Sequence, residues 1–314
     1  MNRIRKDYGP GRLGSQVFTG WEEDILRGES PVFYPIAVDG KLSEIEIGPG
    51  LVTLIGGAPG AGKTAFVMQS VFEAMRLTES LKVVICNVEM TPEVLFDRQL
   101  ARLSGVNLTN IRHRDIPENA AERVLEAMEI IEEVASRICF VPPPFVLDNI
   151  AELYDDFEAD VIVLDYIQRI PPDPKLKQHD FDSKRGSVDA TMAFMRQWAS
   201  NDAAVITVAA VSRQKDNKGR SSYAGDSLSL ASFRESSELE FGADDAFILA
   251  PAGEDPEEVI LKHLKSRHGE PRDIPLTFHR TVQKFEEEPE EAPLMDLADL
   301  RALWNRTKPA REDI

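Results

Sequence analysis

The sequence is poor in cysteine and has no long hydrophobic run. It contains two cysteines in 314 residues, Cys86 and Cys139, and both lie in short apolar segments where cysteine behaves as a small hydrophobic residue. The five histidines show no zinc-ligand spacing, so neither a disulfide framework nor a zinc site is expected. No stretch of about 18 apolar residues occurs, and no apolar run follows the charged N-terminus. We therefore expect a soluble, cytoplasmic protein without a membrane span or signal peptide.

Basic residues are also scarce relative to acidic ones. The chain has 36 Lys and Arg residues against 54 Asp and Glu residues, which gives a formal net charge of -18. A surface of this sign repels the phosphate backbone of nucleic acids. The balance argues against a protein covered by nucleic acid, and any such contact must be concentrated in a local basic site.

Short strand-like segments alternate with helical patterns through most of the chain. This alternation predicts an α/β fold with a mostly parallel, twisted sheet that is flanked by helices on both faces. After residue 250 the segments "VILKHLKSR" and "RDIPLTFHR", separated by "HGEP", predict an antiparallel pair at the sheet edge. The six expected parallel strands are 51–57, 82–88, 137–141, 160–167, 204–211 and 245–250.

Composition divides the chain into three parts. Residues 1–45 are predicted to form an N-terminal arm, residues 46–285 the α/β domain, and residues 286–314 an acidic linker with a C-terminal amphipathic helix. That helix needs an apolar surface, either on its own domain or on a neighbouring subunit. The arm and the tail are the segments where we expect contact with a protein partner.

The segment "GAPGAGKT", residues 57–64, follows one predicted strand and opens a predicted helix. This order predicts a phosphate-binding loop, because backbone N–H groups and the helix N-terminus then converge on a β-phosphate. Lys63 is expected to reach the β- and γ-phosphates, and Thr64 to hold Mg²⁺ through its hydroxyl. The expected nucleotide-binding residues here are Gly57, Ala58, Pro59, Gly60, Ala61, Gly62, Lys63, Thr64 and Ala65.

Two carboxylates end neighbouring predicted strands. Asp165 ends the run "VIVLD", which places it at the sheet edge where ligands of parallel sheets bind, so we expect it to support the Mg²⁺ shell. Glu89 ends "KVVICNVE" in the same layer and is the best-placed base to orient an attacking water. From the residues alone, a surface glutamate remains the alternative for Glu89.

The order of further motifs resembles a known family. The segments "CNVEM", "TPEVLFDRQLARLSGV", "NLTNIRHRDI", "VIVLDYIQRI", "SLASFRESSELEFGADDAFIL" and "LKSRHGE" occur in that order between about residues 50 and 285. They are similar to the successive motifs of the C-terminal ATPase domain of DnaB-type replicative helicases, within the RecA-like superfamily of P-loop NTPases. The resemblance implies a RecA-like fold and a hexameric ring with Mg²⁺ and ATP bound between neighbouring subunits.

The resemblance also implies roles for single residues. Lys63 and Thr64 become the phosphate and Mg²⁺ residues, Glu89 the catalytic base, and Asp165 the acid that supports Mg²⁺. Arg98 matches a family arginine, to which we assign no role.

Lys265 and Arg267 match a basic pair that reaches the γ-phosphate of ATP held by the adjacent subunit. Residues two apart on a strand point to the same face, which lets both enter one pocket. From the residues alone, a solvated strand end is the favoured explanation of this pair.

A γ-phosphate sensor and a DNA-binding loop are expected after the strand at 204–211. The family places a glutamine directly after the serine that ends this strand, whereas this chain has Ser212, Arg213 and then Gln214, so either Arg213 or Gln214 is the sensor. The following loop has three more positive charges than negative ones, which suits the backbone of single-stranded DNA in a ring channel. An exposed lysine-rich turn is the alternative. The loop's basic residues are Arg213, Lys215, Lys218 and Arg220.

Two functions follow from these features. The first is an ATP-hydrolysing helicase or translocase that moves along single-stranded DNA in replication. The second is a nucleotide-dependent oligomeric switch or assembly ATPase that acts on a protein partner without unwinding DNA. The complete motif set and the basic loop favour the first. The net acidity, the altered sensor and the lack of the family's helical N-terminal domain in these 314 residues favour the second.

Overall fold

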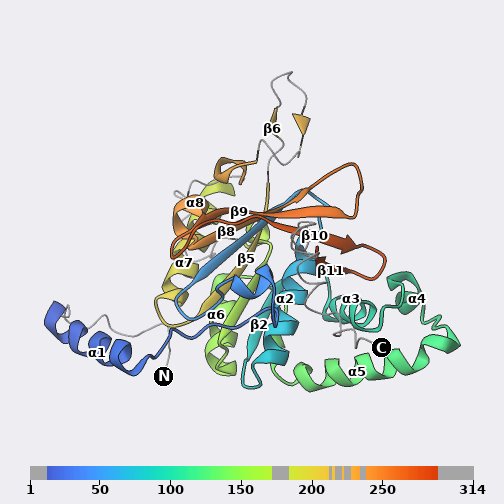
Figure 1. Ribbon diagram of the computed structural model, residues 1–314, viewed down its shortest axis with the longest axis horizontal. Coiled ribbons are helices and arrows are strands. Elements are labelled where there is room, and N and C mark those ends of the chain that lie inside the picture. Colours follow the sequence, from blue (N-terminus) through green and yellow to red (C-terminus); the bar gives the residue numbers. More distant parts are fainter. Residues whose placement is uncertain are drawn as a thin grey trace, which may run out of the picture.

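A nine-stranded sheet forms the centre of the protein (Figure 1). The structure, a computed structural model, describes residues 13–171, 184–211, 214–215, 221–222, 228–233 and 238–288. The strand order is β11-β10-β9-β8-β1-β5-β4-β2-β3. The strands are β1 Val52–Gly57, β2 Val83–Asn87, β3 Ile138–Phe140, β4 Val161–Asp165, β5 Ala204–Ala210, β8 Asp245–Pro251, β9 Glu258–Ser266, β10 Ile274–His279 and β11 Lys284–Glu287.

The parallel part of the sheet confirms the predicted fold class. β8, β1, β5, β4, β2 and β3 are parallel neighbours, and they correspond to the six predicted segments. Along β4, Val161 and Val163 enter the core on one face, whereas Ile162 and Leu164 enter the core on the other face. Alternate side chains are therefore buried on both faces, which explains the continuous apolar runs in the sequence.

Helices cover both faces of the sheet. Helix α2 packs in one core, and α6 and α7 pack in the other. A smaller apolar cluster joins α3, α4 and α5. The helices are α1 Gly14–Arg27, α2 Lys63–Leu77, α3 Pro92–Ser104, α4 Leu108–His113, α5 Ala121–Ala135, α6 Leu147–Phe157, α7 Lys184–Ala199 and α8 Glu238–Gly242, with 3-10 turns η2 Lys41–Glu44, η3 Glu118–Ala120, η4 Ile167–Arg169 and η6 Leu230–Ser232. Within the described part of the chain, no helix is both long and apolar enough to cross a membrane.

The antiparallel edge is larger than predicted. β9 and β10 form the expected pair, and β11 adds a third antiparallel strand that includes residues 286 and 287 of the predicted acidic linker. Phe285 explains the difference, because its ring is buried and stacks on Phe278 with centroids 4.1 Å apart. Glu286 beside it is exposed and Glu287 is partly buried, so the acidic composition of this segment hid the strand. The rest of the predicted linker and the C-terminal helix lie outside the described residues.

Part of the predicted N-terminal arm belongs to the main core. Tyr34, Ile36 and Leu42 are buried against the sheet, and Glu287 accepts hydrogen bonds from the backbone N–H groups of Lys41 (2.9 Å) and Leu42 (2.6 Å). The last part of the predicted arm, residues 34–45, therefore packs on the α/β domain. The sequence did not predict this packing, because the apolar residues of this segment are spaced irregularly among polar ones and match neither a helix nor a strand pattern. Only the preceding segment, with α1, stands apart from the body (Figure 1).

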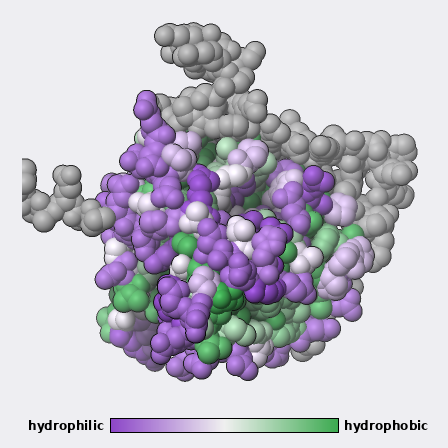
Figure 2. Space-filling view, turned by 90° about the vertical axis from the view of Figure 1, so that its right-hand side faces the viewer, coloured by the Kyte–Doolittle hydropathy of each residue, from purple (hydrophilic) through white to green (hydrophobic). Residues whose placement is uncertain are grey.

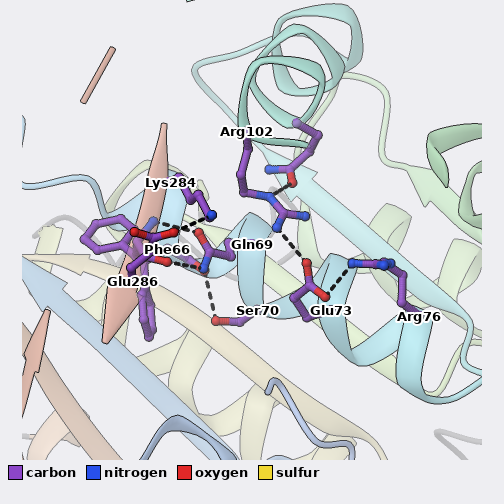
Figure 3. A network of polar contacts seen from close by, with 10 residues as sticks. Phe66, Gln69, Ser70, Glu73, Arg76, Arg102, Lys284 and Glu286 are labelled. Atoms are coloured by element: carbon purple, nitrogen blue, oxygen red, sulfur yellow. Dashed lines mark hydrogen bonds and ion pairs between the residues drawn. The ribbon is translucent and has the colours of Figure 1, made fainter. Parts of the chain in front are cut away.

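A polar network joins strand β11 and helix α3 to helix α2 (Figure 3). The Gln69 side chain donates to the Phe285 carbonyl (2.8 Å) and accepts from the Phe285 N–H (2.9 Å). One turn later, Glu73 accepts from the buried Arg102 of α3 (2.6 Å) and from Arg76 (2.9 Å). Because α2 begins at the predicted phosphate loop, the network fixes β11 and α3 relative to that loop.

The face that carries α4, α5 and the β10–β11 hairpin is mostly hydrophilic, with hydrophobic surface gathered in its lower part (Figure 2). Leu125 and Met128 of α5 are exposed and line an apolar groove against Phe96 and Leu100 of α3. Asp97 and acidic residues of α5 also line this groove, so its apolar floor has a negative rim.

Candidate nucleotide-binding site

The predicted phosphate loop connects the central strand β1 to α2. β1 lies between β8 and β5, and α2 begins at Lys63, directly after the glycine-rich turn. Gly60 and Gly62 have φ angles of 77° and 91°, in the left-handed region that favours glycine. A Cβ atom on Gly62 would lie 2.7 Å from the Phe278 ring. The turn therefore has the strand, loop and helix order that a phosphate site requires.

Lys63 is held within this loop. Its ammonium donates to the carbonyl oxygens of Gly57 (2.9 Å) and Ala58 (3.0 Å). Burial lowers the pKa of Lys63, while the nearby carboxylates of Asp165 and Glu89 act to raise it. A desolvated cation surrounded by the loop backbone interacts strongly with an anion placed there.

Thr64 and Asp165 meet at the carboxyl ends of β1 and β4, as predicted. The Thr64 hydroxyl donates to Asp165 Oδ2 (2.6 Å), and Asn87 Nδ2 donates to the same oxygen (2.9 Å). Burial raises the pKa of Asp165, and the Thr64 hydrogen bond and the Lys63 charge oppose this shift. A carboxylate beside a hydroxyl is an oxygen donor set of the kind that Mg²⁺ prefers.

Asn87 is a site residue that the sequence analysis missed. It ends β2 opposite Asp165 in the parallel register. Its Oδ1 accepts from the backbone N–H groups of Glu89 (3.1 Å) and Met90 (2.8 Å), while its Nδ2 binds Asp165. Asn87 therefore fixes the backbone of Glu89 relative to Asp165. A polar residue that ends an apolar run next to Glu89 was the available signal.

A cavity of about 440 Å³ collects these side chains. Lys63, Thr64, Glu89 and Asp165 line it together, so the structure brings the predicted phosphate, metal and base residues to one place. They come from α2, β4 and the turn after β2, which all meet at the carboxyl edge of the parallel strands. This is the edge where ligands bind in sheets of this kind.

Two arginines complete the cavity wall. Arg98 of α3 donates to Gln283 Oε1 (2.9 Å), and its buried Nε atom has no hydrogen-bond partner among the described residues. Arg280, which we did not predict, follows β10 and donates to the carbonyls of Gly60 (2.9 Å) and Pro256 (2.8 and 2.9 Å). Its guanidinium also lies 4.9 Å from the Phe278 ring centroid. The β10–β11 hairpin thereby binds the phosphate loop directly.

Replacement of Asp165 by asparagine is expected to stabilise the ligand-free protein at neutral pH. Burial raises the pKa of Asp165 in the folded protein above the ordinary aspartate value of 3.8. The Asp165 side chain therefore favours the folded state most at low pH, where it is protonated. This stabilisation is lost as the pH rises from about 3.8 through the raised pKa, because the ionised carboxylate is then buried. Asp165→Asn removes this cost, so at pH 7 its Tm should exceed the wild-type Tm by a few degrees, and the difference should shrink near pH 4.

Thermal unfolding followed by circular dichroism at both pH values measures this effect. The same variant should lose Mg²⁺-dependent hydrolysis, since the carboxylate is then missing. A lower Tm than wild type at pH 7 would contradict the inferred direction of the pKa shift.

Lys265 and Arg267 lie at the other end of β1 from the cavity. Thr53, at the start of β1, pairs with Asp245, and Asp245 pairs with Ser266, whereas the phosphate loop follows the end of β1. Both basic side chains reach the Phe241 carbonyl, Lys265 at 3.2 Å and Arg267 at 3.5 Å, as expected for residues on one face. The structure therefore does not bring this pair to the subunit's own Lys63.

The predicted DNA loop follows β5, which ends beside β1 with Ala210 opposite Gly57. Its described residues form a two-stranded ribbon, β6 Gln214–Lys215 and β7 Ser221–Ser222, which projects from the body (Figure 1). The basic residues Arg213, Lys218 and Arg220 lie outside the described residues, as do the side chains of Gln214 and Lys215. The choice of Arg213 or Gln214 as sensor thus remains a prediction.

Comparisons with known proteins agree with this geometry. The curated relatives include probable plasmid replicative DNA helicases of Chlamydia trachomatis serovar L2 and of Chlamydia trachomatis, each 22% identical over 240 residues, or 75% of this chain. The chain spans about half the length of these relatives, as the match covers 50% of each.

Solved structures share the fold. The ATPase domain of G40P matches with a TM-score of 0.72 at 20% identity, covering 89% of this chain and 99% of that one. A DnaB-like replicative helicase, described with its interactions with primase, matches with a TM-score of 0.70 at 19% identity, covering 89% and 68%. The family model described as DnaB-like helicase C terminal domain matches residues 46–287. Because this match covers more than half of the chain, the protein belongs to the family of DnaB-like helicase C-terminal domains.

Proposed function

We propose that this protein is an ATP-hydrolysing ring motor, a helicase or translocase on single-stranded DNA that serves DNA replication. The proposal rests on how the site residues are divided between the two ends of β1. One end presents Lys63, Thr64 and the cavity, and the other presents Lys265 and Arg267. A single subunit cannot use both ends on one nucleotide, whereas a ring of subunits can.

The cavity residues suit the part of an ATPase site that a subunit provides for its own nucleotide. Lys63 and the loop backbone bind the β- and γ-phosphates, and Thr64 and Asp165 would hold Mg²⁺, which neutralises phosphate charge when bound. Glu89 lines the cavity with its backbone fixed by Asn87, and it orients the attacking water. Arg267 from the adjacent subunit supplies positive charge to the γ-phosphate as negative charge develops there.

Exposed apolar surface supports the oligomer. Helix α1 has no buried residue, and its Phe18, Trp21 and Ile25 side chains are all more than half exposed. Large apolar side chains gathered on one exposed helix mark a contact with another surface. A hexameric ring, in which α1 and the α3–α5 groove are covered by neighbouring subunits, accounts for this exposure.

The DNA-binding part of the proposal is supported by the position of the loop after β5. The loop begins at the same sheet edge as the phosphate loop, since Ala210 pairs with Gly57. Gln168, after β4, binds both the N–H (3.1 Å) and the carbonyl (3.3 Å) of Ala210. Nucleotide and DNA would therefore act on neighbouring ends of parallel strands. Arg213, Lys215, Lys218 and Arg220 are the proposed phosphate-backbone contacts.

The ATPase rate with and without single-stranded DNA tests this function. We expect a several-fold stimulation at about 50 mM salt that declines steeply by about 250 mM, because backbone contacts release counterions. Serine in place of Lys218 and Arg220 should reduce both the stimulation and its salt dependence, and blunt duplex of the same length should stimulate less.

A rate that is indifferent to single-stranded DNA at low salt would contradict the motor. It would favour the alternative, a nucleotide-dependent switch or assembly ATPase that acts on a protein partner. The net charge of -18 supports this alternative, because an acidic surface repels the DNA backbone.

A further inference from the structure

Arg267 is bound in its own subunit by one buried carboxylate, Asp244. Asp244 precedes β8, and its side chain is 2% exposed. Its Oδ1 pairs with Arg267 Nη1 (2.5 Å), while its Oδ2 pairs with Arg196 Nη1 of α7 (2.5 Å) and accepts from the Val52 N–H (2.8 Å). A carboxylate buried this fully needs such partners, and here it has two guanidinium groups and one backbone N–H.

The contact leaves part of the Arg267 guanidinium available. The Arg267 side chain is 42% exposed, although its partner is almost wholly buried. A guanidinium carries five N–H donors in one plane, so a carboxylate on one edge sets the direction in which the other edges point. Asp244 therefore orients the group without covering it.

Asp244 also offsets a crowding of positive charge. Lys265 shares the Phe241 carbonyl with Arg267 and also donates to the Ala243 carbonyl (2.7 Å), while Arg196 pairs with the other oxygen of Asp244. Burial lowers the pKa of Lys265, the neighbouring Arg267 and Arg196 charges act in the same direction, and Asp244 acts to raise it. Without the Asp244 charge, these three cations would repel one another, and the long contact with the Phe241 carbonyl (3.5 Å) would hold Arg267 only weakly.

Asp244 further ties Arg267 to β1. Its bond to the Val52 N–H lies at the first residue of β1, and the phosphate loop begins at the last residue, Gly57. The strand is buried along its whole length. In the proposed ring, each subunit contributes Lys63 to one nucleotide site and Arg267 to the next. The rigid strand β1 thus sets the distance between these two contributions, which we call the Lys63 half-site and the Arg267 half-site.

We propose that Asp244 is the positioning residue for Arg267, which it aims at the nucleotide of the neighbouring subunit. The inference rests on the proposed function, in which Arg267 acts in trans. Asp244→Asn keeps the shape of the side chain and an oxygen for the Val52 N–H, but it removes the charge. We expect kcat to fall about 100-fold, as for a misplaced catalytic group, with little change in KM for ATP.

Mixed rings separate positioning from a general structural role. In the Asp244→Asn subunit the Lys63 half-site is intact, and a Lys63→Ala subunit supplies an undamaged Arg267. Mixing the two impaired proteins should raise hydrolysis well above that of either alone, since each Asp244→Asn subunit can then receive Arg267 from its neighbour. If Asp244 only stabilised the fold, both half-sites of the variant would fail and mixing would restore nothing.

A parallel mixture of Arg267→Ala with Lys63→Ala is the reference. Restoration in the reference but not with Asp244→Asn would overturn the positioning role and leave the proposed function standing. Failure of both mixtures, with mixed rings demonstrated by native mass spectrometry, would overturn action in trans and this inference with it. A wild-type kcat for Asp244→Asn would also overturn it. If Asp244→Asn does not fold, Arg196→Met, which removes only one partner of Asp244, should show a several-fold loss and the same restoration.

Discussion

Lys63→Ala is expected to abolish ATP hydrolysis, with kcat reduced by about 1,000-fold or more. Lys63 is the cation that the phosphate loop holds against the Gly57 and Ala58 carbonyls, and it lines the same cavity as Asp165 and Glu89. Removing it takes away the positive charge that meets the β- and γ-phosphates. Phosphate release measured at saturating ATP and Mg²⁺ gives the loss directly.

Lys82→Ala is a matched control for this variant. Lys82 directly precedes β2, at the amino-terminal end of the parallel strands, whereas the cavity lies at their carboxyl ends. Its ammonium donates to the Phe157 carbonyl (3.3 Å). Its loss should leave kcat close to the wild-type value, because Lys82 does not line the cavity. Full activity of Lys63→Ala would remove the basis for an ATPase at this cavity.

Arg267→Ala is expected to lose hydrolysis while still binding ATP. A cation supplied in trans to the γ-phosphate contributes about 10³ to 10⁵ in kcat, whereas most binding contacts come from the phosphate loop of the same subunit. We therefore expect kcat to fall by about three orders of magnitude and the Kd of a fluorescent ATP analogue to change only slightly. Single-turnover hydrolysis and equilibrium titration measure the two quantities separately.

Arg272→Ala controls for loss of positive charge in the same region. The Arg272 side chain is 65% exposed and pairs with Glu44 on the surface, where such pairs contribute about 0–1 kcal/mol. This variant should keep near wild-type kcat. Equal losses of ATP binding and hydrolysis in Arg267→Ala would indicate a damaged fold instead of a missing catalytic cation.

The parallel sheet and the centre of the site were predictable because their signals are local. Strands such as β4 are buried on both faces, so they appear as continuous apolar runs bounded by turns. The phosphate loop is one contiguous motif, and Asp165 and Glu89 are marked by their place at the ends of such runs. Parallel neighbours in one sheet then bring these ends together without further information.

The hairpin residues were not predictable, because their roles arise from long-range contacts. Arg280 contacts Gly60, which lies 220 residues earlier, only when the β10–β11 hairpin packs over the phosphate loop. Gln69 likewise bonds to Phe285, 216 residues later in the chain. The strand β11 was hidden by its acidic residues. Tyr34 and Ile36 were hidden by irregular spacing in a segment that packs on the sheet without a periodic pattern.

The partner of a charged residue was the other piece of information that the sequence did not contain. "LKSR" identifies two basic residues on one face of a strand end, but they are joined by Asp244, which precedes β8, and by Arg196 of α7. The location of this cluster at the far end of β1 from Lys63 is a property of the register between β1, β8 and β9. If Arg267 acts on a nucleotide, as proposed, that location means that the nucleotide must belong to a second subunit.

The most direct test of a nucleotide site shared between subunits is the activity of mixed rings made from Lys63→Ala and Arg267→Ala proteins. Each protein alone should be inactive. On mixing, hydrolysis should appear and should be greatest near equal proportions, because an intact Lys63 in one subunit then faces an intact Arg267 in the next. Absence of activity at every ratio, with mixed rings shown by native mass spectrometry, would contradict the shared site.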